Sequence, residues 1–307
     1  MHAQVLIIGS GPAGYTASIY AARAGLETVL LMGHMAGGQL MLTHEVENYP
    51  GFTKISGIDL MENFQKQAES VGVSLKYESA VKVDLSKRPF KVETDMGVQW
   101  TADALIIATG SSAKWLGIPS EEKYKGHGVS VCATCDGFFY KGKNVAVIGG
   151  GSSAVYEALF LSQIAQSVTL IHRRDTLRAE KKLQSQILSN PKIQIRWDSE
   201  VTEFQGDERL KSISIINNKT KVTSLLPVDG VFVAIGHHPN TELFQGQLEI
   251  EPSGYIKTNK KTFETSVPGV FACGDVQEEI FRQAIIAAGT GCIAALSAER
   301  FLINEKR

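Results

Sequence analysis

Two glycine-rich motifs, 140 residues apart (149 − 9), constrain the fold of this 307-residue chain more than any other feature. Each motif follows a short apolar run: residues 5–8 (VLII) precede residues 9–14 (GSGPAG), and residues 145–148 (VAVI) precede residues 149–154 (GGGSSA). Such runs are typical of parallel strands buried on both faces. In a strand, glycine turn and helix, the glycines let a pyrophosphate approach the backbone at the helix N-terminus. The repeat therefore predicts two Rossmann-like dinucleotide-binding folds in an α/β protein.

The repeat extends beyond the glycine motifs. Residues 229–236 (DGVFVAIG) have the pattern of residues 103–110 (DALIIATG), another buried strand that ends in a turn of small residues. About 70 residues follow Gly236, which is too few for a third domain without disulfides or metal. We therefore expect the C-terminal segment to return to the first fold, with a strand near residue 270, a helix over 282–296 and a frayed tail from 302 to 307.

The two folds differ where each second strand ends. The NAD fingerprint has an acidic residue there, but the first fold has Met32, and a glycine-rich turn at residues 37–39 suggests a longer cofactor. His172 is aligned with Met32 in the second fold, and Arg173, Arg174 and Arg178 follow it. Arginines there favour a 2′-phosphate, and hence NADPH over NADH. The alternative is an ordinary solvated charged face.

A Cys-x-x-Cys motif separates the two folds. Cys132 and Cys135 can form a small disulfide, and Asp136 beside them can move the proton that its opening requires. The pair could instead be half of a zinc site, although Cys273 and Cys292 have the wrong spacing to complete it. For Asp136 the alternative is a helix N-cap or a turn residue. These residues predict electron transfer through a disulfide.

Composition and charge exclude several classes of protein. With 31 basic and 32 acidic side chains, the chain has no excess charge for binding nucleic acid or an anionic membrane. No N-terminal targeting segment is recognised, and we expect no membrane span. Four cysteines, two of them in one motif, do not resemble the disulfide framework of a secreted protein. The expected location is the cytoplasm.

Together these motifs resemble the bacterial-type, low-molecular-weight thioredoxin reductases over essentially the whole chain. The most specific matches are GSGPAGYTA, GGQL, EVENYPG, CATCDGFFY, HRRDTLRA, and FACGDV with RQA, between residues 9 and 284. The resemblance implies an FAD domain at 1–113 and 245–307 and an inserted NADPH domain at 114–244 that carries the disulfide. It also implies a homodimer, thioredoxin as protein substrate, and domain rotation between the half-reactions.

The resemblance assigns roles to individual residues. Cys135 would receive electrons from the flavin, Cys132 would attack the disulfide of thioredoxin, and Asp136 would be the acid-base group. Phe138 and Phe139 would form an apolar contact for thioredoxin, although they could equally be ordinary core residues. The chain departs from the family pattern at three positions, which are His127, Ser152 and Tyr156.

The remaining implied contacts are to the two cofactors. The FAD contacts would be Gly9, Ser10, Gly11, Pro12, Ala13, Gly14, Gly37, Gly38, Gln39, Leu40, Asn48, Val81, Ala108, Thr109, Gly110, Gly274, Asp275, Arg282, Gln283 and Ala284. The NADPH contacts would be Gly149, Gly151, Ser152, Ser153, Ala154, His172, Arg173, Arg174, Arg178, Ile235 and Gly236. No metal site is expected.

Three other functions fit parts of the sequence. Reductases that serve ferredoxin or flavodoxin have a similar architecture but lack the redox Cys-x-x-Cys. Reductases linked to peroxiredoxins normally carry an added N-terminal thioredoxin-like region, and we do not expect one here. A nucleotide-sensing flavoprotein would bind FAD and NADPH without passing electrons onward.

Overall fold

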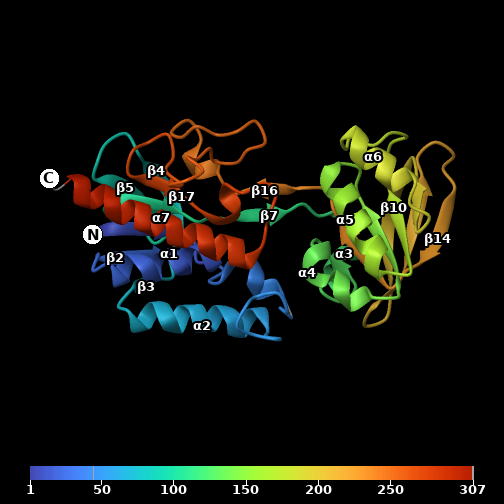
Figure 1. The fold of residues 1–307 in the computed structure, drawn as a ribbon, viewed down its shortest axis with the longest axis horizontal. Helices are drawn as coiled ribbons and strands as arrows, with labels where there is room; N and C mark the ends of the chain where they lie inside the picture. The colour runs from blue at the N-terminus through green and yellow to red at the C-terminus, as the bar shows by residue number, and fades with distance from the viewer. Residues whose placement is uncertain (44, 306–307) are drawn as a thin grey trace. The chain divides into compact units, whose positions relative to one another are not determined.

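The computed structural model describes residues 1–43 and 45–305 and divides into two compact units (Figure 1). The first comprises Met1–Ser112 with His238–Arg307, and the second is Ala113–His237. The second unit is thus an insertion in the first, as the sequence indicates. The insertion ends at 237/238, whereas the sequence predicts 244/245, because Phe244 is fully buried in the core of the first unit.

The first unit is built on a seven-stranded sheet. Six of its strands have the order β3-β2-β1-β6-β5-β4, and the seventh, β17, pairs with β6. Its long strand β6 pairs antiparallel with β5 through its first half and parallel with β17 through its second half. The central strand β1 is parallel to both β2 and β6. The strands are β1 (His2–Ile8), β2 (Thr28–Leu31), β3 (Ser74–Lys76), β4 (Ala80–Asp84), β5 (Phe90–Thr94), β6 (Gln99–Ile107) and β17 (Val270–Ala272).

Three helices pack with this sheet: α1 (Pro12–Arg23), α2 (Gly57–Ser70) and α7 (Ala284–Glu305). Contrary to the sequence-based expectation, α7 is long and apolar enough to cross a membrane by length and composition alone. Its alanine-rich face is buried in the core of the first unit, as expected for the core helix of a globular unit. The frayed tail predicted from residue 302 is wrong as far as Glu305, because α7 continues to that residue and Leu302 is buried.

The second unit contains a parallel five-stranded sheet with the order β11-β10-β9-β15-β8 and an antiparallel sheet β12-β13-β14. The parallel strands are β8 (Val129–Ser130), β9 (Asn144–Ile148), β10 (Ser167–Ile171), β11 (Ile193–Arg196) and β15 (Gly230–Val233). The antiparallel strands are β12 (Ser199–Gly206), β13 (Leu210–Asn217) and β14 (Thr223–Pro227). The helices are α3 (Glu121–Tyr124), α4 (Ala133–Asp136), α5 (Ser152–Ile164) and α6 (Lys181–Leu188).

The chain crosses between the units twice, and the two crossing segments pair with each other. They form the two-stranded sheet of β7 (Ser111–Ala113) and β16 (His237–Pro239). Backbone hydrogen bonds extend the pairing on both sides, from Asn240 N to Gly110 O and from Lys114 N to Gly236 O, each at 3.0 Å. Four short 3-10 helices complete the secondary structure of the described residues: η1 (Gly38–Leu42), η2 (Gly137–Tyr140), η3 (Glu242–Phe244) and η4 (Gly274–Val276).

Helices α1 and α7 approach each other closely at a glycine. A Cβ atom on Gly291 would lie 2.2 Å from the carbonyl oxygen of Ala13, whereas a Cβ atom on Gly289 would meet nothing within 4 Å. The same substitution in one helix should therefore have opposite effects at the two positions.

Gly291→Ala should destabilise the protein by about 1–3 kcal/mol, because the added methyl group forces the two helices apart. The matched control Gly289→Ala should stabilise it by roughly 0.5–1 kcal/mol, since alanine costs less backbone entropy than glycine within a helix. Denaturant unfolding followed by circular dichroism measures both changes. Equal shifts in the two variants would contradict the tight contact at Gly291.

Candidate redox and nucleotide-binding sites

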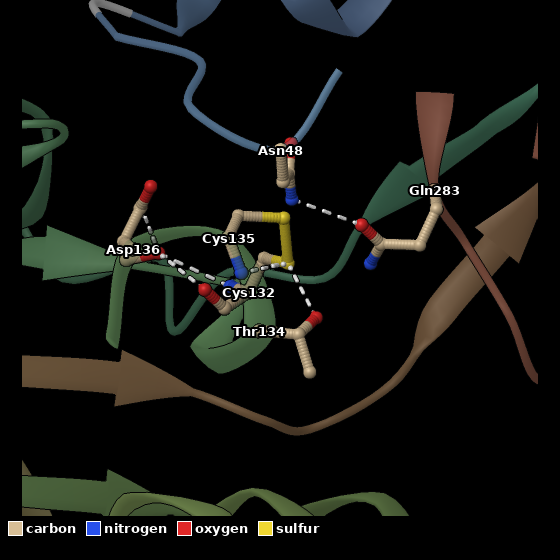
Figure 2. Close-up of a disulfide and its surroundings, with 7 residues drawn as sticks. Asn48, Cys132, Thr134, Cys135, Asp136 and Gln283 are labelled. Carbon is tan, nitrogen blue, oxygen red and sulfur yellow. Dashed lines mark hydrogen bonds between the residues drawn. A yellow bond between two sulfur atoms is a disulfide. The ribbon is translucent and has the colours of Figure 1, made fainter. Parts of the chain in front are cut away.

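A disulfide joins Cys132 and Cys135 in the second unit, with their Cα atoms 5.3 Å apart (Figure 2). Cys132 is the N-cap residue of α4, and its sulfur accepts a hydrogen bond from the backbone N–H of Cys135 at 3.2 Å. The Thr134 hydroxyl lies 3.4 Å from the same sulfur. Among residues 1–43 and 45–305, no cluster of three or more His, Cys, Asp or Glu side chains could hold a metal ion. The two cysteines of the motif thus form a disulfide, which can be reduced and re-formed.

Ser130 connects Asp136 to the disulfide loop. Its hydroxyl donates to Asp136 Oδ2 at 2.6 Å and accepts from the backbone N–H of Cys132 at 3.1 Å. Burial raises the pKa of Asp136, and the hydrogen bond from Ser130 partly offsets this rise. Asp136 does occupy the N-cap position of η2, but its side chain makes no capping bond there. Sequence reasoning missed Ser130, because a serine two residues before a cysteine has no distinctive pattern.

The aromatic residues after the motif differ in their surroundings. Phe138 is 63% exposed and Phe139 is 37% exposed, so the alternative reading of both as core residues is wrong. The Tyr140 ring instead packs edge-on against Phe232, and burial, with the nearby Asp136 charge, raises the pKa of Tyr140 to about 12. The second unit thus presents an apolar surface two residues after Asp136.

The first glycine motif forms an open backbone cradle in the first unit. Helix α1 has no side-chain cap at its N-terminus, and a Cβ atom on Gly11 would meet nothing within 4 Å. A Cβ atom on Gly14, in contrast, would lie 1.8 Å from Gly9 O, so this position requires glycine. The uncapped N–H groups and the open space at Gly11 fit a pyrophosphate.

Other residues expected at the first cofactor gather around this turn. The Ser10 hydroxyl donates to Met32 O at 2.7 Å and accepts from Gly37 N at 3.1 Å, which connects the motif to the second glycine turn. Pro12 and Ala13 open α1, and Gly38, Gln39 and Leu40 open η1.

The remaining expected residues of the first unit lie on several segments from both of its sequence pieces. Ala108, Thr109 and Gly110 follow β6, and a Cβ atom on Gly9 would clash with Ala108 O. Val81 lies on β4, three residues after Glu78, whose carbonyl accepts a hydrogen bond from Gly33 N at 3.0 Å.

Asn48 and the C-terminal segment supply the rest of this set. Asn48 Nδ2 donates to Gln283 Oε1 at 3.2 Å, just before Ala284 begins α7. Gly274 and Asp275 lie in η4, and burial raises the pKa of Asp275 to about 6, although the charge of Arg282 opposes this rise. A cofactor that spans these segments would contact both sequence pieces of the first unit.

The second glycine motif has the same geometry in the second unit. Helix α5 begins without a side-chain cap at Gly151, which faces open space. The Ala154 Cβ atom packs where a Cβ atom on Gly149 would lie, at 2.7 Å, so α5 sits close to the turn. Ser152 and Ser153 lie in the first turn of α5. Ile235 and Gly236 lie just after the end of β15.

Residues 172–178, here called the arginine loop, follow β10. His172 is buried, its ring covers Gly150, and its Nε2 atom lies 3.0 Å from Thr176 O. Burial, with the three neighbouring arginines, lowers the pKa of His172 against the opposing hydrogen bond to Thr176 O, which favours the neutral ring. Arg178 N donates to Gly150 O at 2.7 Å, which fixes the loop against the glycine turn.

The guanidinium groups of Arg173, Arg174 and Arg178 are on exposed residues of this loop. Within the described residues, no ion pair joins any of them to a carboxylate. The carboxylate of Asp175, between them in sequence, pairs with Lys219 at 3.0 Å instead. The loop can therefore offer unneutralised positive charge to an anionic ligand.

Ser130→Ala should raise the pKa of Asp136 further. The hydroxyl of Ser130 donates a hydrogen bond that stabilises the ionised carboxylate, and the substitution removes it. Since the pKa is already above the ordinary value in the folded state, ionisation of Asp136 opposes folding. Its contribution to stability is fully present below the unfolded pKa and is lost as the pH rises through the folded pKa. A titration of isotope-labelled aspartate carboxyls by NMR measures the shift. Ser167→Ala, which removes a hydroxyl bonded to Asn144, should leave this titration unchanged.

Comparison with known proteins places these sites in a family. The pattern of the pyridine nucleotide-disulphide oxidoreductases matches residues 3–291. A thioredoxin reductase of Rickettsia conorii is 55% identical over 303 residues, which cover 97% of this chain and 98% of that protein. One of Coxiella burnetii is 50% identical over 98% of this chain and 97% of that protein. The solved thioredoxin reductase of Giardia duodenalis has a TM-score of 0.95 at 43% identity, covering 98% of this chain and 99% of that one. The chain therefore belongs to the pyridine nucleotide-disulphide oxidoreductases, among the thioredoxin reductases of bacterial type.

Proposed function

We propose that this enzyme transfers two electrons from NADPH, through FAD and the Cys132–Cys135 disulfide, to oxidised thioredoxin. The observation that carries this proposal is the disulfide at the start of α4, with the half-buried Asp136 carboxyl held beside it by Ser130. A nucleotide-sensing flavoprotein has no use for such a pair, and reductases for ferredoxin or flavodoxin lack it. The disulfide therefore favours a dithiol reductase over these alternatives.

Cys132 is the thiol suited to attack the partner. In the disulfide its sulfur already accepts the Cys135 N–H at the start of α4, and the same contact would stabilise a thiolate after reduction. The Cys132 thiolate attacks one sulfur of the thioredoxin disulfide and forms a mixed disulfide, and the other thioredoxin sulfur leaves as a thiolate. The Cys135 thiolate then attacks Cys132, which restores the intramolecular disulfide and releases the second thioredoxin sulfur.

Asp136 is suited to move the protons of this exchange. Thioredoxin leaves with two thiols, so two protons must reach its sulfurs for each disulfide reduced. Burial raises the pKa of Asp136, which favours the protonated carboxyl as a donor to a departing thiolate. Ser130 and the backbone of Cys132 keep that carboxyl beside the pair.

The two glycine cradles fit the two cofactors. FAD would be held by the first unit, where the cradle at Gly11 and the turn at Gly37 support a long dinucleotide. NADPH would be held by the second unit, where the arginine loop provides charge for the 2′-phosphate. When bound, the flavin accepts a hydride from the nicotinamide and supplies two electrons to the disulfide.

The organisation of the chain supports alternation between half-reactions. The disulfide and the proposed NADPH site belong to the same unit, and one face of a flavin cannot meet both at once. Rotation of the second unit about the paired crossings β7 and β16 would present each in turn. Phe138 and Phe139 would contact thioredoxin from the same unit. The proposal also includes a homodimer, which the family resemblance implies, and a location in the cytoplasm, which the sequence suggests.

Cys135→Ser should reduce the rate of NADPH-dependent thioredoxin reduction to background, because no intramolecular disulfide can form. NADPH should still bleach the flavin absorbance, since the nucleotide sites are unchanged. The matched control Cys292→Ser removes a free thiol from α7 and should keep both activities. Thioredoxin reduction that survives in Cys135→Ser would exclude the proposed path.

Replacement of both Arg173 and Arg178 by Ala should lower kcat/KM for NADPH by at least about tenfold, as the loss of charge-assisted hydrogen bonds predicts. The rate with NADH should change by less than about twofold, because NADH lacks the phosphate that these side chains would bind. Arg209→Ala, at an exposed arginine outside the arginine loop, serves as the control. Equal losses with the two nucleotides would remove the phosphate assignment.

A further inference from the structure

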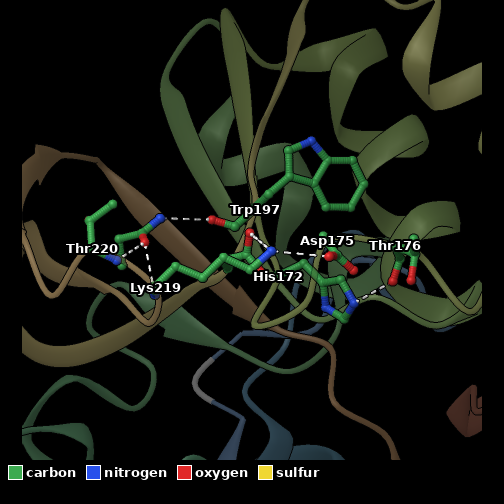
Figure 3. Close-up of polar contacts among 8 residues, drawn as sticks. His172, Asp175, Thr176, Trp197, Lys219 and Thr220 are labelled. Atoms are coloured by element: carbon green, nitrogen blue, oxygen red, sulfur yellow. Dashed lines mark hydrogen bonds and ion pairs between the residues drawn. The ribbon is translucent and has the colours of Figure 1, made fainter.

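Lys219 forms ion pairs with two carboxylates, one of them in the arginine loop (Figure 3). Its Nζ atom lies 3.0 Å from Asp175 Oδ2 and 3.0 Å from Asp198 Oδ2. Asp175 directly follows Arg173 and Arg174, the side chains that the proposed function assigns to the 2′-phosphate. A negative charge therefore lies in the same loop as the proposed anion site, and Lys219 is its ion-pair partner.

The backbone holds Lys219 in this place. Lys219 lies in the turn between β13 and β14, where Asn217 Oδ1 accepts its N–H at 3.0 Å. The turn is bonded to the arginine loop through Asp198, whose carbonyl accepts from Asn218 N at 2.6 Å and whose N–H donates to Arg174 O at 3.1 Å. The antiparallel sheet thus presents its lysine to the nucleotide-binding sheet of the same unit.

Folding stability does not account for the pairing of Lys219 with Asp175. Their side chains are 62% and 65% exposed, and ion pairs as exposed as these contribute little to stability. The Asp198 side chain is only 18% exposed, so its pair with Lys219 helps to hold the turn. The pair does affect the local charge. The hydrogen bond and charge of Lys219 lower the pKa of Asp175, which favours the ionised carboxylate, and Lys219 compensates its negative charge.

We propose that Lys219 is a positioning residue that sets the preference for 2′-phosphorylated nucleotides. It pairs with the Asp175 carboxylate, which would otherwise repel the 2′-phosphate and compete with it for Arg173 and Arg174. In a dinucleotide fold, an unshielded carboxylate after the second strand favours an unphosphorylated ribose. This inference rests on the proposed NADPH site and identifies the groups that keep the site selective.

The test compares two nucleotides that differ only in the 2′-phosphate, adenosine 2′,5′-bisphosphate and adenosine 5′-monophosphate. Isothermal titration calorimetry with the purified full-length protein measures the Kd of each. Lys219→Met should weaken binding of the bisphosphate about five- to tenfold, as expected for an uncompensated Asp175 charge near the phosphate in a high effective dielectric. Binding of the monophosphate should change by less than about twofold. Lys219→Arg should retain the preference for the bisphosphate, because it keeps the positive charge.

A second variant separates charge shielding from a structural role. In Lys219→Met with Asp175→Asn, the carboxylate of the arginine loop is gone, while Asp198 still lacks its lysine. The preference should nevertheless return to nearly that of the wild type, because the proposal assigns the effect to Asp175. Lys211→Met is the control, because Lys211 forms an exposed ion pair with Asp207 at 2.5 Å near the β12–β13 turn, at the other end of β13. It should leave both Kd values unchanged.

The outcomes distinguish this inference from the proposed function. A wild-type protein without preference for the bisphosphate would overturn the proposed NADPH site. A wild-type preference that Lys219→Met leaves intact, or that the double variant fails to restore, would overturn the role of Lys219 alone. Equal weakening of both nucleotides would show that Lys219 only supports the fold of the turn, and would also overturn the inference.

Discussion

The close contact between helix and strand at each glycine turn is the constraint on which both units depend. In the first unit, Gly14 fits over the carbonyl of Gly9 where no side chain could fit, and in the second unit Ala154 occupies the equivalent place over Gly149. The contact draws the N-terminus of each helix to the carboxyl edge of its sheet. Unpaired N–H groups then face the space where a phosphate can bind. The loops that follow the neighbouring strands are gathered at the same edge.

Much of this organisation could be predicted from the sequence, because it depends on local patterns. Apolar runs followed by glycine turns predicted the parallel strands, and the repeat predicted two related folds with one inserted in the other. The end of the insertion was placed too late, because the burial of Phe244 depends on packing against strands far away in the sequence. The continuation of α7 past residue 302 was missed for a similar reason, since Leu302 is buried only by tertiary contacts.

The candidate sites divide in the same way. The cysteines, the glycines and the arginines were found because their spacing carries the chemistry. Ser130 and Lys219 were not found, because each acts on a residue that folding brings to it. Lys219 is 44 residues from Asp175 in the sequence and reaches it only through a turn of another sheet. Both missed residues lower the pKa of a carboxyl group, Ser130 that of Asp136 and Lys219 that of Asp175. In the described hydrogen bonds and ion pairs, neither side chain contacts a sulfur atom or an arginine side chain.

The paired crossings show how the chain accommodates the inserted unit. Because β7 and β16 lie side by side, the chain enters and leaves the inserted unit at one place on the first unit. The first sheet is complete without the insertion, since none of its seven strands comes from residues 113–237. Joining residue 112 directly to residue 238 would therefore leave every strand of the seven-stranded sheet in place.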